Sequence, residues 1–184
     1  MNQDLRKYVK SNLVRELDEI KKSNRFNNIN ELDEFEKAII YHYTDSGYEV
    51  LNQTLREGGN LTEFGKYLNY SLNKLPNYRL LCYRAIKCSE TKLKKYHKAF
   101  NSDTVIVEKS FLSCSKSKML SQYFSDSPLF IILSKRGKEI EKIAKFGIDS
   151  SENEREILFM SNSKFKVIDF RKEDNKITIT LEEI

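Results

Sequence analysis

Tryptophan is absent from this chain of 184 residues, and histidine and cysteine are scarce. The two histidines, His42 and His97, form no HExxH or similar pair, which argues against a histidine-rich metal centre. The three cysteines, Cys82, Cys88 and Cys114, are odd in number and lack CxxC spacing. Neither a disulfide framework nor a zinc site is therefore expected, and idle thiols are typical of a reducing cytosol.

Long apolar runs are missing as well. No stretch approaches the roughly 20 residues of a membrane span, and the opening MNQDLRKYVKSNL lacks the apolar region of a secretory signal. We expect a chain that is cytoplasmic as synthesised and has no membrane partner. If it acts on another cell, we expect a specialised secretion system to deliver it.

Charge is only mildly unbalanced, with a formal net charge of +5. This excess favours encounter with acidic partners but does not by itself indicate nucleic-acid binding. The length is sufficient for a core without metals or disulfides. The simplest organisation is one domain over residues 1–184, with a mainly helical part over 1–76 and a mainly β core over 77–184.

The first part of the chain has the patterns of helices. Apolar residues recur at helical spacing and predict an amphipathic first helix: Leu5, Val9, Leu13, Leu17 and Ile20. Asn30 with Asp33 resembles a capping pair for a second helix through His42. A third helix is expected to start at residue 46 and a fourth after residue 62, because glycine and proline stops follow each.

From residue 78 the character changes to short runs rich in β-branched and aromatic residues, which predict strands. The runs are YRLLCYRAI, TVIVEKSFLSCS, PLFIIL, REILF, KFKVIDF and KITITLEE. Short helices are expected between them, over about 90–100 and 116–124. Helices first and strands afterwards favour the α+β class over an alternating parallel-sheet fold.

Two glutamates stand at the head of a predicted strand, in Glu154-Arg155-Glu156. If the strand includes both, their side chains share one face. Neighbouring carboxylates repel, so one pKa rises and the pair suits acid–base chemistry. The same spacing is also typical of a charged strand end without function.

An arginine and two serines are further candidates. Arg84 lies inside an apolar strand, where a guanidinium needs an anion such as phosphate or a carboxylate. Ser113 and Ser115 share a strand face and can donate hydrogen bonds to a carboxylate or a sugar. The alternatives are an exposed or ion-paired arginine, and serines that merely end a strand.

A basic stretch over residues 92–98 contains four lysines and a histidine. It could follow a phosphate backbone. Such runs are more often the solvated face of a helix.

The order of these segments carries more information than any one of them. An arginine on a strand, then F-x-S-x-S, then E-x-E before a later strand, resembles the arginine–serine–glutamate class of mono-ADP-ribosyltransferases. Upstream, AIIYHYTDSGYEVLNQTLR looks like the helical signature of the bacterial exoenzyme and toxin members, including the enzymatic halves of clostridial binary toxins. The resemblance covers about residues 38–184.

The resemblance implies a fold and a site. The fold would be two packed, roughly perpendicular antiparallel sheets with N-terminal helices. NAD would be the co-substrate and no metal would be needed. Arg84 would bind the NAD phosphates, and Ser113 would orient the catalytic carboxylate Glu156. Glu156 would hold the ribose hydroxyl and favour the oxocarbenium-like state, while Glu154 would act on the acceptor. The remaining residues implied to contact NAD are Tyr43, Asn52 and Ser115.

The sequence departs from the family pattern in places. Cys114 stands where threonine is usual, and residues 121–134 hold no arginine, for which Lys116 or Lys118 could substitute. Ser151 stands where relatives often place an aromatic that touches a protein acceptor. The change at Ser151 concerns the acceptor and not the chemistry.

The predicted function is that of a toxin or effector that transfers ADP-ribose from NAD to a macromolecule and releases nicotinamide. Within the class, a glutamate at the first E-x-E position tends to accompany arginine acceptors, so a protein arginine is expected first. The alternatives are RNA or DNA modified by a toxin–antitoxin or phage-defence toxin, an NAD glycohydrolase, and a non-catalytic binding module. An antitoxin or immunity protein would be a further partner.

Overall fold

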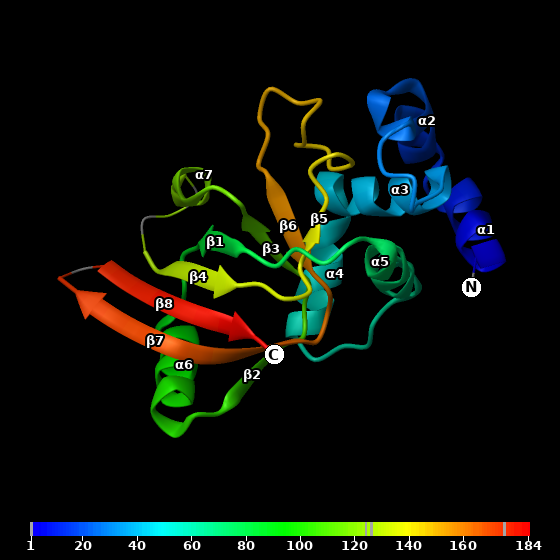
Figure 1. Ribbon diagram of the computed structural model, residues 1–184. Helices are drawn as coiled ribbons and strands as arrows, with labels where there is room; N and C mark the ends of the chain where they lie inside the picture. The colour runs from blue at the N-terminus through cyan, green and yellow to red at the C-terminus, as the bar shows by residue number, and fades with distance from the viewer. Residues whose placement is uncertain (1, 124, 126, 175) are drawn as a thin grey trace. The chain divides into compact units, whose positions relative to one another are not determined.

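The computed structural model describes residues 2–123, 125, 127–174 and 176–184 (Figure 1). Helices dominate the first part of the chain and strands the second, so the predicted α+β class is confirmed. The helices are α1 Asn2–Asn12, α2 Val14–Lys22, η1 Asn24–Phe26, α3 Glu34–His42, η2 Tyr43–Gly47, α4 Tyr48–Arg56, α5 Glu63–Lys74, α6 Glu90–Ser102 and α7 Lys118–Gln122. The strands are β1 Leu81–Ala85, β2 Val105–Glu108, β3 Leu112–Ser115, β4 Leu129–Leu133, β5 Lys138–Glu139, β6 Glu156–Phe159, β7 Ser163–Glu173 and β8 Lys176–Glu183.

The strands follow one another in a single hydrogen-bonded order, β2-β7-β8-β4-β1-β3-β6-β5. β1 runs antiparallel to β4 with Arg84 opposite Phe130, and antiparallel to β3 with Tyr83 opposite Ser115. β4 and β8 are parallel, which differs from the purely antiparallel pairing implied by the resemblance. The division into two sheets is not confirmed by this order.

The chain forms two compact units. The first consists of the chain up to Pro76 together with Lys138–Glu156, and the second of Asn77–Gly137 with Ile157–Ile184. The predicted change of character after residue 76 coincides with the first junction. The single-domain organisation remains a prediction.

The N-terminal amphipathic stripe forms two helices rather than the one that was predicted. At Leu13 the backbone leaves the helical region, with φ −129° and ψ 41°, so α1 ends before it and α2 begins after it. The apolar stripe nevertheless stays on one side, because all five of its residues are buried. Burial of that face therefore continues across the break.

The second helix begins one turn later than its predicted cap. Asp33, not Asn30, is the N-cap of α3, and its Oδ1 accepts hydrogen bonds from the backbone N–H groups of Phe35 and Glu36 at 3.0 Å each. Glu36 accepts in return from the Asp33 N–H at 3.0 Å. The pair that matters is thus Asp33 with Glu36, a reciprocal capping box.

The third predicted helix does not start at Ser46. Helix α3 continues through the π-helical turn η2 into α4, without a cap between them. Gly47 lies in this turn, and a Cβ there would be 2.8 Å from Cδ2 of His42. The wide turn therefore depends on glycine. The fourth helix, α5, is capped by Thr62 as predicted, whose Oγ1 accepts from the Gly65 N–H at 3.2 Å.

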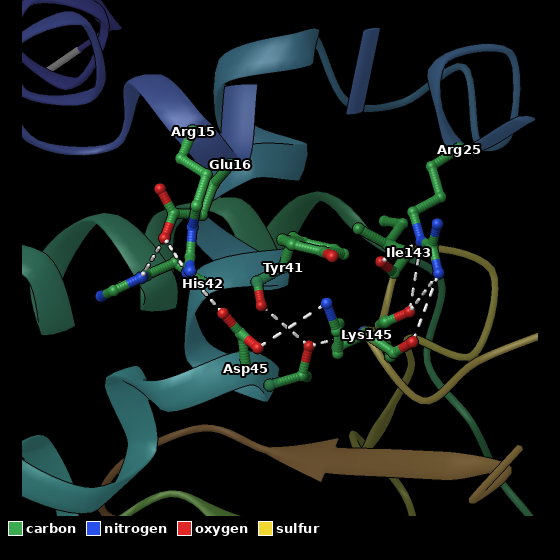
Figure 2. Close-up of polar contacts among 10 residues, drawn as sticks. Arg15, Glu16, Arg25, Tyr41, His42, Asp45, Ile143 and Lys145 are labelled. Atoms are coloured by element: carbon green, nitrogen blue, oxygen red, sulfur yellow. Dashed lines mark hydrogen bonds and ion pairs between the residues drawn. The ribbon is translucent and has the colours of Figure 1, made fainter. Parts of the chain in front are cut away.

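Polar contacts join α2 to the α3–η2 segment within the first unit (Figure 2). Arg15 bonds Glu16 at 2.9 Å and Asp45 at 2.5 Å, and Glu16 Oε1 lies 3.0 Å from Nδ1 of His42. Burial acts to raise the pKa of Glu16, but hydrogen bonds from the backbone, Arg15 and His42 outweigh it, so the pKa is lowered. The network therefore favours the ionised carboxylate.

The core of the second unit lies between its strands and α6, which packs against β7. Phe159 and Phe165 are both fully buried and meet edge to face with ring centroids 5.3 Å apart. Tyr96 of α6 donates to Glu108 Oε1 at 2.8 Å, and burial above all raises the Tyr96 pKa. The predicted helix at 90–100 is confirmed, while the one at 116–124 is shorter. Its predicted last residue, Phe124, lies outside the described residues.

None of the helices in the described part of the chain is both long enough and apolar enough to cross a membrane.

Candidate active site

Glu156 is the first residue of β6, and only 6% of its surface is exposed. Its carbonyl oxygen accepts a hydrogen bond from the Ile140 N–H at 3.2 Å. The strand continues into the buried residues 157–159. A carboxylate at the head of a buried strand has a fixed backbone, which suits a group that must meet a substrate in one geometry.

Glu154 precedes the strand, so the expectation that it shares a strand face with Glu156 is wrong. Between them Arg155 adopts a left-handed backbone with φ 52°, which interrupts the extended alternation on which that expectation depended. The Glu154 N–H donates to the carbonyl of Phe146 at 2.9 Å. Asn153 Oδ1 accepts from the Arg155 N–H at 2.9 Å and supports the turn. Glu154 is therefore positioned by a loop and Glu156 by a strand.

The electrostatic environment of Glu154 disfavours its charge. Burial raises the pKa of Glu154, and repulsion from the Glu152 carboxylate raises it further. Burial also raises the pKa of Tyr48, with contributions from Glu49 and from Glu154. Glu154 and Tyr48 therefore lie within electrostatic reach of one another.

Tyr43 and Asn52 meet in the first unit. Asn52 Nδ2 donates to the Tyr43 hydroxyl at 3.0 Å, and both side chains are buried. The Tyr43 and Tyr48 ring centroids lie 6.3 Å apart. The π-helical turn that begins at Tyr43 brings these residues together, and such turns are frequent at functional sites. Their predicted contact with NAD remains a prediction.

Arg84 and Ser113 meet in the second unit, on β1 and β3. Arg84 Nη1 donates to the backbone carbonyl of Ser113. The Nε of Arg84 is buried and has no hydrogen-bond partner among the described residues. A buried guanidinium N–H without an acceptor is costly, so it indicates a site for an anionic ligand.

Ser115 has a more structural contact. Its Oγ accepts from the Ser117 N–H at 3.0 Å, which shapes the turn into α7. Of the two lysines expected to substitute for a phosphate-binding arginine, Lys116 is half-buried and Lys118 is exposed at the start of α7. Among the described residues, no group of three or more His, Cys, Asp or Glu side chains is arranged to hold a metal ion.

Two residues that the sequence did not mark as part of the site, Gly147 and Asn153, brace the loop before Glu154. Asn153 Nδ2 donates to Glu141 Oε1 at 2.8 Å, across the loop. A Cβ at Gly147 would lie 1.9 Å from the Glu141 carbonyl oxygen, so no other residue fits there without a backbone shift. The glycine and the asparagine before a charged pair were the available signals, since both residue types favour tight turns.

Two proteins are related to this chain in sequence. Over 136 residues, or 71% of the chain, it is 31% identical to Mav of Mycobacterium avium (strain 104), named as a candidate NAD(+)–arginine ADP-ribosyltransferase. Over 168 residues, or 81% of the chain, it is 27% identical to Vis of Vibrio splendidus (strain 12B01), which has the same kind of name. The matched regions span 15% of Mav and 64% of Vis.

Solved structures share the fold. HopU1 of Pseudomonas syringae pv. tomato, an ADP-ribosyltransferase, matches with a TM-score of 0.77 at 20% identity, over 91% of this chain and 86% of HopU1. Exoenzyme S of Pseudomonas aeruginosa, solved with human 14-3-3 protein beta and carba-NAD, also gives 0.77 at 16% identity, over 98% and 88%. Vis in complex with agmatine gives 0.67 at 23% identity, over 95% and 85%.

The family model for NAD:arginine ADP-ribosyltransferases matches residues 1–184. The chain therefore belongs to the NAD:arginine ADP-ribosyltransferase family.

Proposed function

We propose that this protein is a mono-ADP-ribosyltransferase that moves ADP-ribose from NAD to an arginine guanidinium and releases nicotinamide. The observation that carries the proposal is the family match over residues 1–184 in a chain whose Glu156 stands at the head of a buried strand. The names of Mav and Vis agree with an arginine acceptor.

The NAD-binding role falls first to Arg84. Its buried Nε has no acceptor among the described residues, and a phosphate oxygen would supply one. Its Nη1 is held by the Ser113 carbonyl, which fixes the direction of the guanidinium. Tyr43, Asn52 and Ser115 complete the proposed NAD site.

Glu156 is the proposed catalytic carboxylate. The C1′–N bond to nicotinamide breaks with its electron pair going to the pyridinium nitrogen, so positive charge develops on the ribose. A carboxylate fixed near that charge stabilises the transition state more than the ground state. Ser113 would orient this carboxylate.

Glu154 is the residue proposed to activate the acceptor guanidinium. A guanidinium nitrogen attacks C1′ and loses one proton, which the Glu154 carboxylate accepts. The raised pKa of Glu154 suits this step, because a stronger base accepts the proton more readily. The balanced products are nicotinamide, the ADP-ribosylated arginine and one proton.

Other acceptors receive less support. The basic stretch at 92–98 lies on α6, where Lys94 is 3.8 Å from Glu90 and Lys95 is 3.8 Å from Glu108. Those ion pairs fit a solvated helix face better than a nucleic-acid surface. An NAD glycohydrolase would need no acceptor carboxylate, so the half-buried Glu154 favours transfer. Action as a toxin or effector, delivery to a target cell and an antitoxin partner belong to this proposal.

Labelled NAD offered together with agmatine and a cell lysate tests the proposal. We expect label on agmatine and on protein, with loss of the protein label after protease treatment but not after nuclease treatment. Label sensitive only to nuclease would contradict the arginine acceptor. Release of nicotinamide without transfer would instead indicate a glycohydrolase.

Glu156→Gln is the matched test of the site, because it removes the charge while preserving shape. We expect transfer and NAD hydrolysis to fall at least about 100-fold, the range for removal of one preorganised electrostatic group. Thermal unfolding should change little. Transfer at a rate near that of the unaltered protein would overturn the assignment.

A further inference from the structure

Arg25 lies far from the predicted site residues in sequence but contacts the loop that carries Glu154. It is the middle residue of η1, and only 8% of its surface is exposed. Its Nε donates to the carbonyls of Ile143 at 3.1 Å and Ala144 at 3.3 Å, and its Nη2 to those of Ala144 at 3.2 Å and Lys145 at 3.3 Å. Figure 2 shows the guanidinium directed at these carbonyl oxygens.

The three carbonyls end a single helical turn. Ile143 and Ala144 both donate their N–H groups to the carbonyl of Ile140, at 2.8 and 2.9 Å. Carbonyl groups at the end of such a turn have no partner within it, and a cationic fork satisfies them well. Asp149, whose Oδ2 is 3.8 Å from Nη1 of Arg25, balances the charge.

Arg25 is itself held in place. Its guanidinium carbon lies 5.3 Å from the centroid of the Tyr41 ring, a cation–π distance. The next residue, Phe26, accepts at its carbonyl from Lys37 Nζ at 2.7 Å. Lys37 is buried, and burial lowers its pKa. These contacts fix the Arg25 guanidinium, so its N–H donors face the loop carbonyls in one orientation.

A second contact holds the same turn from α3 and η2. Thr44 Oγ1 accepts from the Lys145 N–H at 2.8 Å and donates to the carbonyl of Tyr41 at 2.9 Å. Lys145 Nζ lies 5.5 Å from the Tyr41 ring centroid and 3.9 Å from Asp45 Oδ1. The backbone carbonyl of Lys145 thus accepts from Arg25 of η1, and its backbone N–H donates to Thr44 of η2 (Figure 2).

Between this turn and Glu154 the loop is constrained by hydrogen bonds. The Ile148 N–H bonds the carbonyl of Glu141 at 3.0 Å, and Asn153 Nδ2 bonds the Glu141 carboxylate at 2.8 Å. The Glu154 N–H bonds the carbonyl of Phe146, the residue directly after the clamped turn, at 2.9 Å. A shift of residues 143–145 would therefore carry over to Glu154.

We propose that Arg25 is a positioning residue for the acceptor step: by fixing the carbonyls of residues 143–145 it sets where Glu154 meets the acceptor. This inference rests on the proposed function. Arg25 acts through the loop and not on NAD, so it should matter for the acceptor more than for cleavage of the nicotinamide bond. A merely structural role would instead reduce both activities together.

The variants Arg25→Ala and Arg25→Lys, with Arg6→Ala as control, test the inference in the full chain. Arg6 belongs to the same helical segment and pairs with Asp33 at 2.9 Å, away from the loop. We expect Arg25→Ala to lower kcat/KM for agmatine at least about 10-fold, in line with the cost of misplacing a reacting group, while NAD hydrolysis without acceptor changes less than about twofold. Arg25→Lys should fall between, since an ammonium is a point donor without the fork.

Amide hydrogen exchange over residues 143–154 supplies a readout independent of catalysis. Exchange should accelerate there in Arg25→Ala and stay unchanged in Arg6→Ala. Unchanged exchange, or equal loss of transfer and hydrolysis in the Arg25→Lys protein, would overturn the inference. If the unaltered protein transfers nothing to agmatine, the proposed function fails, and exchange alone decides whether Arg25 holds the loop.

Discussion

One residue separates Glu154 from Glu156, yet their surroundings differ. Glu156 is buried at the start of β6, whereas Glu154 is half-buried in a loop ahead of the left-handed Arg155. Carboxylates in unlike environments can take unlike roles within one reaction. The left-handed backbone at Arg155 therefore separates Glu154, the proposed acid–base group, from Glu156, the proposed electrostatic one.

The raised pKa of Glu154 leads to a prediction about pH. As the proposed base, Glu154 works only when ionised, so kcat/KM for agmatine should rise with pH through its pKa. Glu152→Gln removes the like charge that helps to raise this pKa, so the acidic limb of the profile should move to lower pH. The profiles of the two proteins, measured side by side, check this; a limb at unchanged pH would contradict the assignment.

The same shift affects stability in a stated direction. A carboxyl whose pKa is higher in the folded than in the unfolded protein binds its proton more tightly when folded. Stability is therefore lost as pH rises from the unfolded to the folded pKa. Glu154→Gln should consequently be at least as stable as the unaltered protein at neutral pH, as measured by urea unfolding.

The site residues were predicted from the order of their motifs along the chain and not from any predicted contact between them. The sequence could pair Arg84 with Ser113 only through the resemblance, and the structure brings them together through the Ser113 carbonyl rather than its hydroxyl. It gave no sign of Arg25, because the partners of Arg25 are backbone carbonyls, and carbonyls leave no trace in residue type. Contacts between a side chain and distant backbone groups therefore cannot be predicted from residue types.

At the scale of elements, helix caps can be tested directly by stability measurements. Asp33→Ala removes both hydrogen bonds of the α3 cap and should cost about 1 kcal/mol, up to about 2 kcal/mol. Asp18→Ala, which breaks only an exposed pair with Lys22 at 3.9 Å, should change stability by less than about 0.5 kcal/mol. Urea unfolding of both variants distinguishes a cap from a surface charge.

The loop before β6 offers a second test at this scale. Gly147→Ala would place Cβ 1.9 Å from the Glu141 carbonyl, so the loop must shift. Gly58→Ala meets no atom within 4 Å but is strained by its φ of 89°, at a cost of about 1–2 kcal/mol. Both should lower stability, but only Gly147→Ala should also reduce transfer to agmatine. Equal transfer by the two proteins would show that the loop geometry is unimportant.

The helices with side-chain caps were predictable, whereas the joint between α3 and α4 was not. Ser46 was expected to start a new helix, since serine favours the N-cap position. Here the chain continues through a π-helical turn, and Gly47 serves the close approach of His42. Packing of Gly47 against His42 decides between a new helix and a continuous π-helical turn, and a local sequence pattern cannot report such packing.

For the molecule as a whole, NAD binding should appear as added stability. Carba-NAD, the analogue bound in the exoenzyme S structure, at about 100 times its Kd should add about 2.7 kcal/mol, which raises Tm by about 5–10 °C in a chain of this size. Arg84→Ala should remove most of this shift. A full shift in the Arg84→Ala protein would contradict its proposed role with the phosphates.

The first compact unit draws on two stretches of chain, and this has a consequence for folding. Arg25 bonds a carbonyl 118 residues further along the sequence, and contacts of such separation form slowly because a long loop must close first. During synthesis the helices before Pro76 emerge early, but Ile140 and Ile143, which are fully buried in this unit, reach them only after most of the chain exists. The loop that carries Glu154 is therefore among the last parts to take shape, and an unfinished chain holds Arg84, the proposed NAD-binding residue, before it holds Glu154, the residue proposed to act on the acceptor.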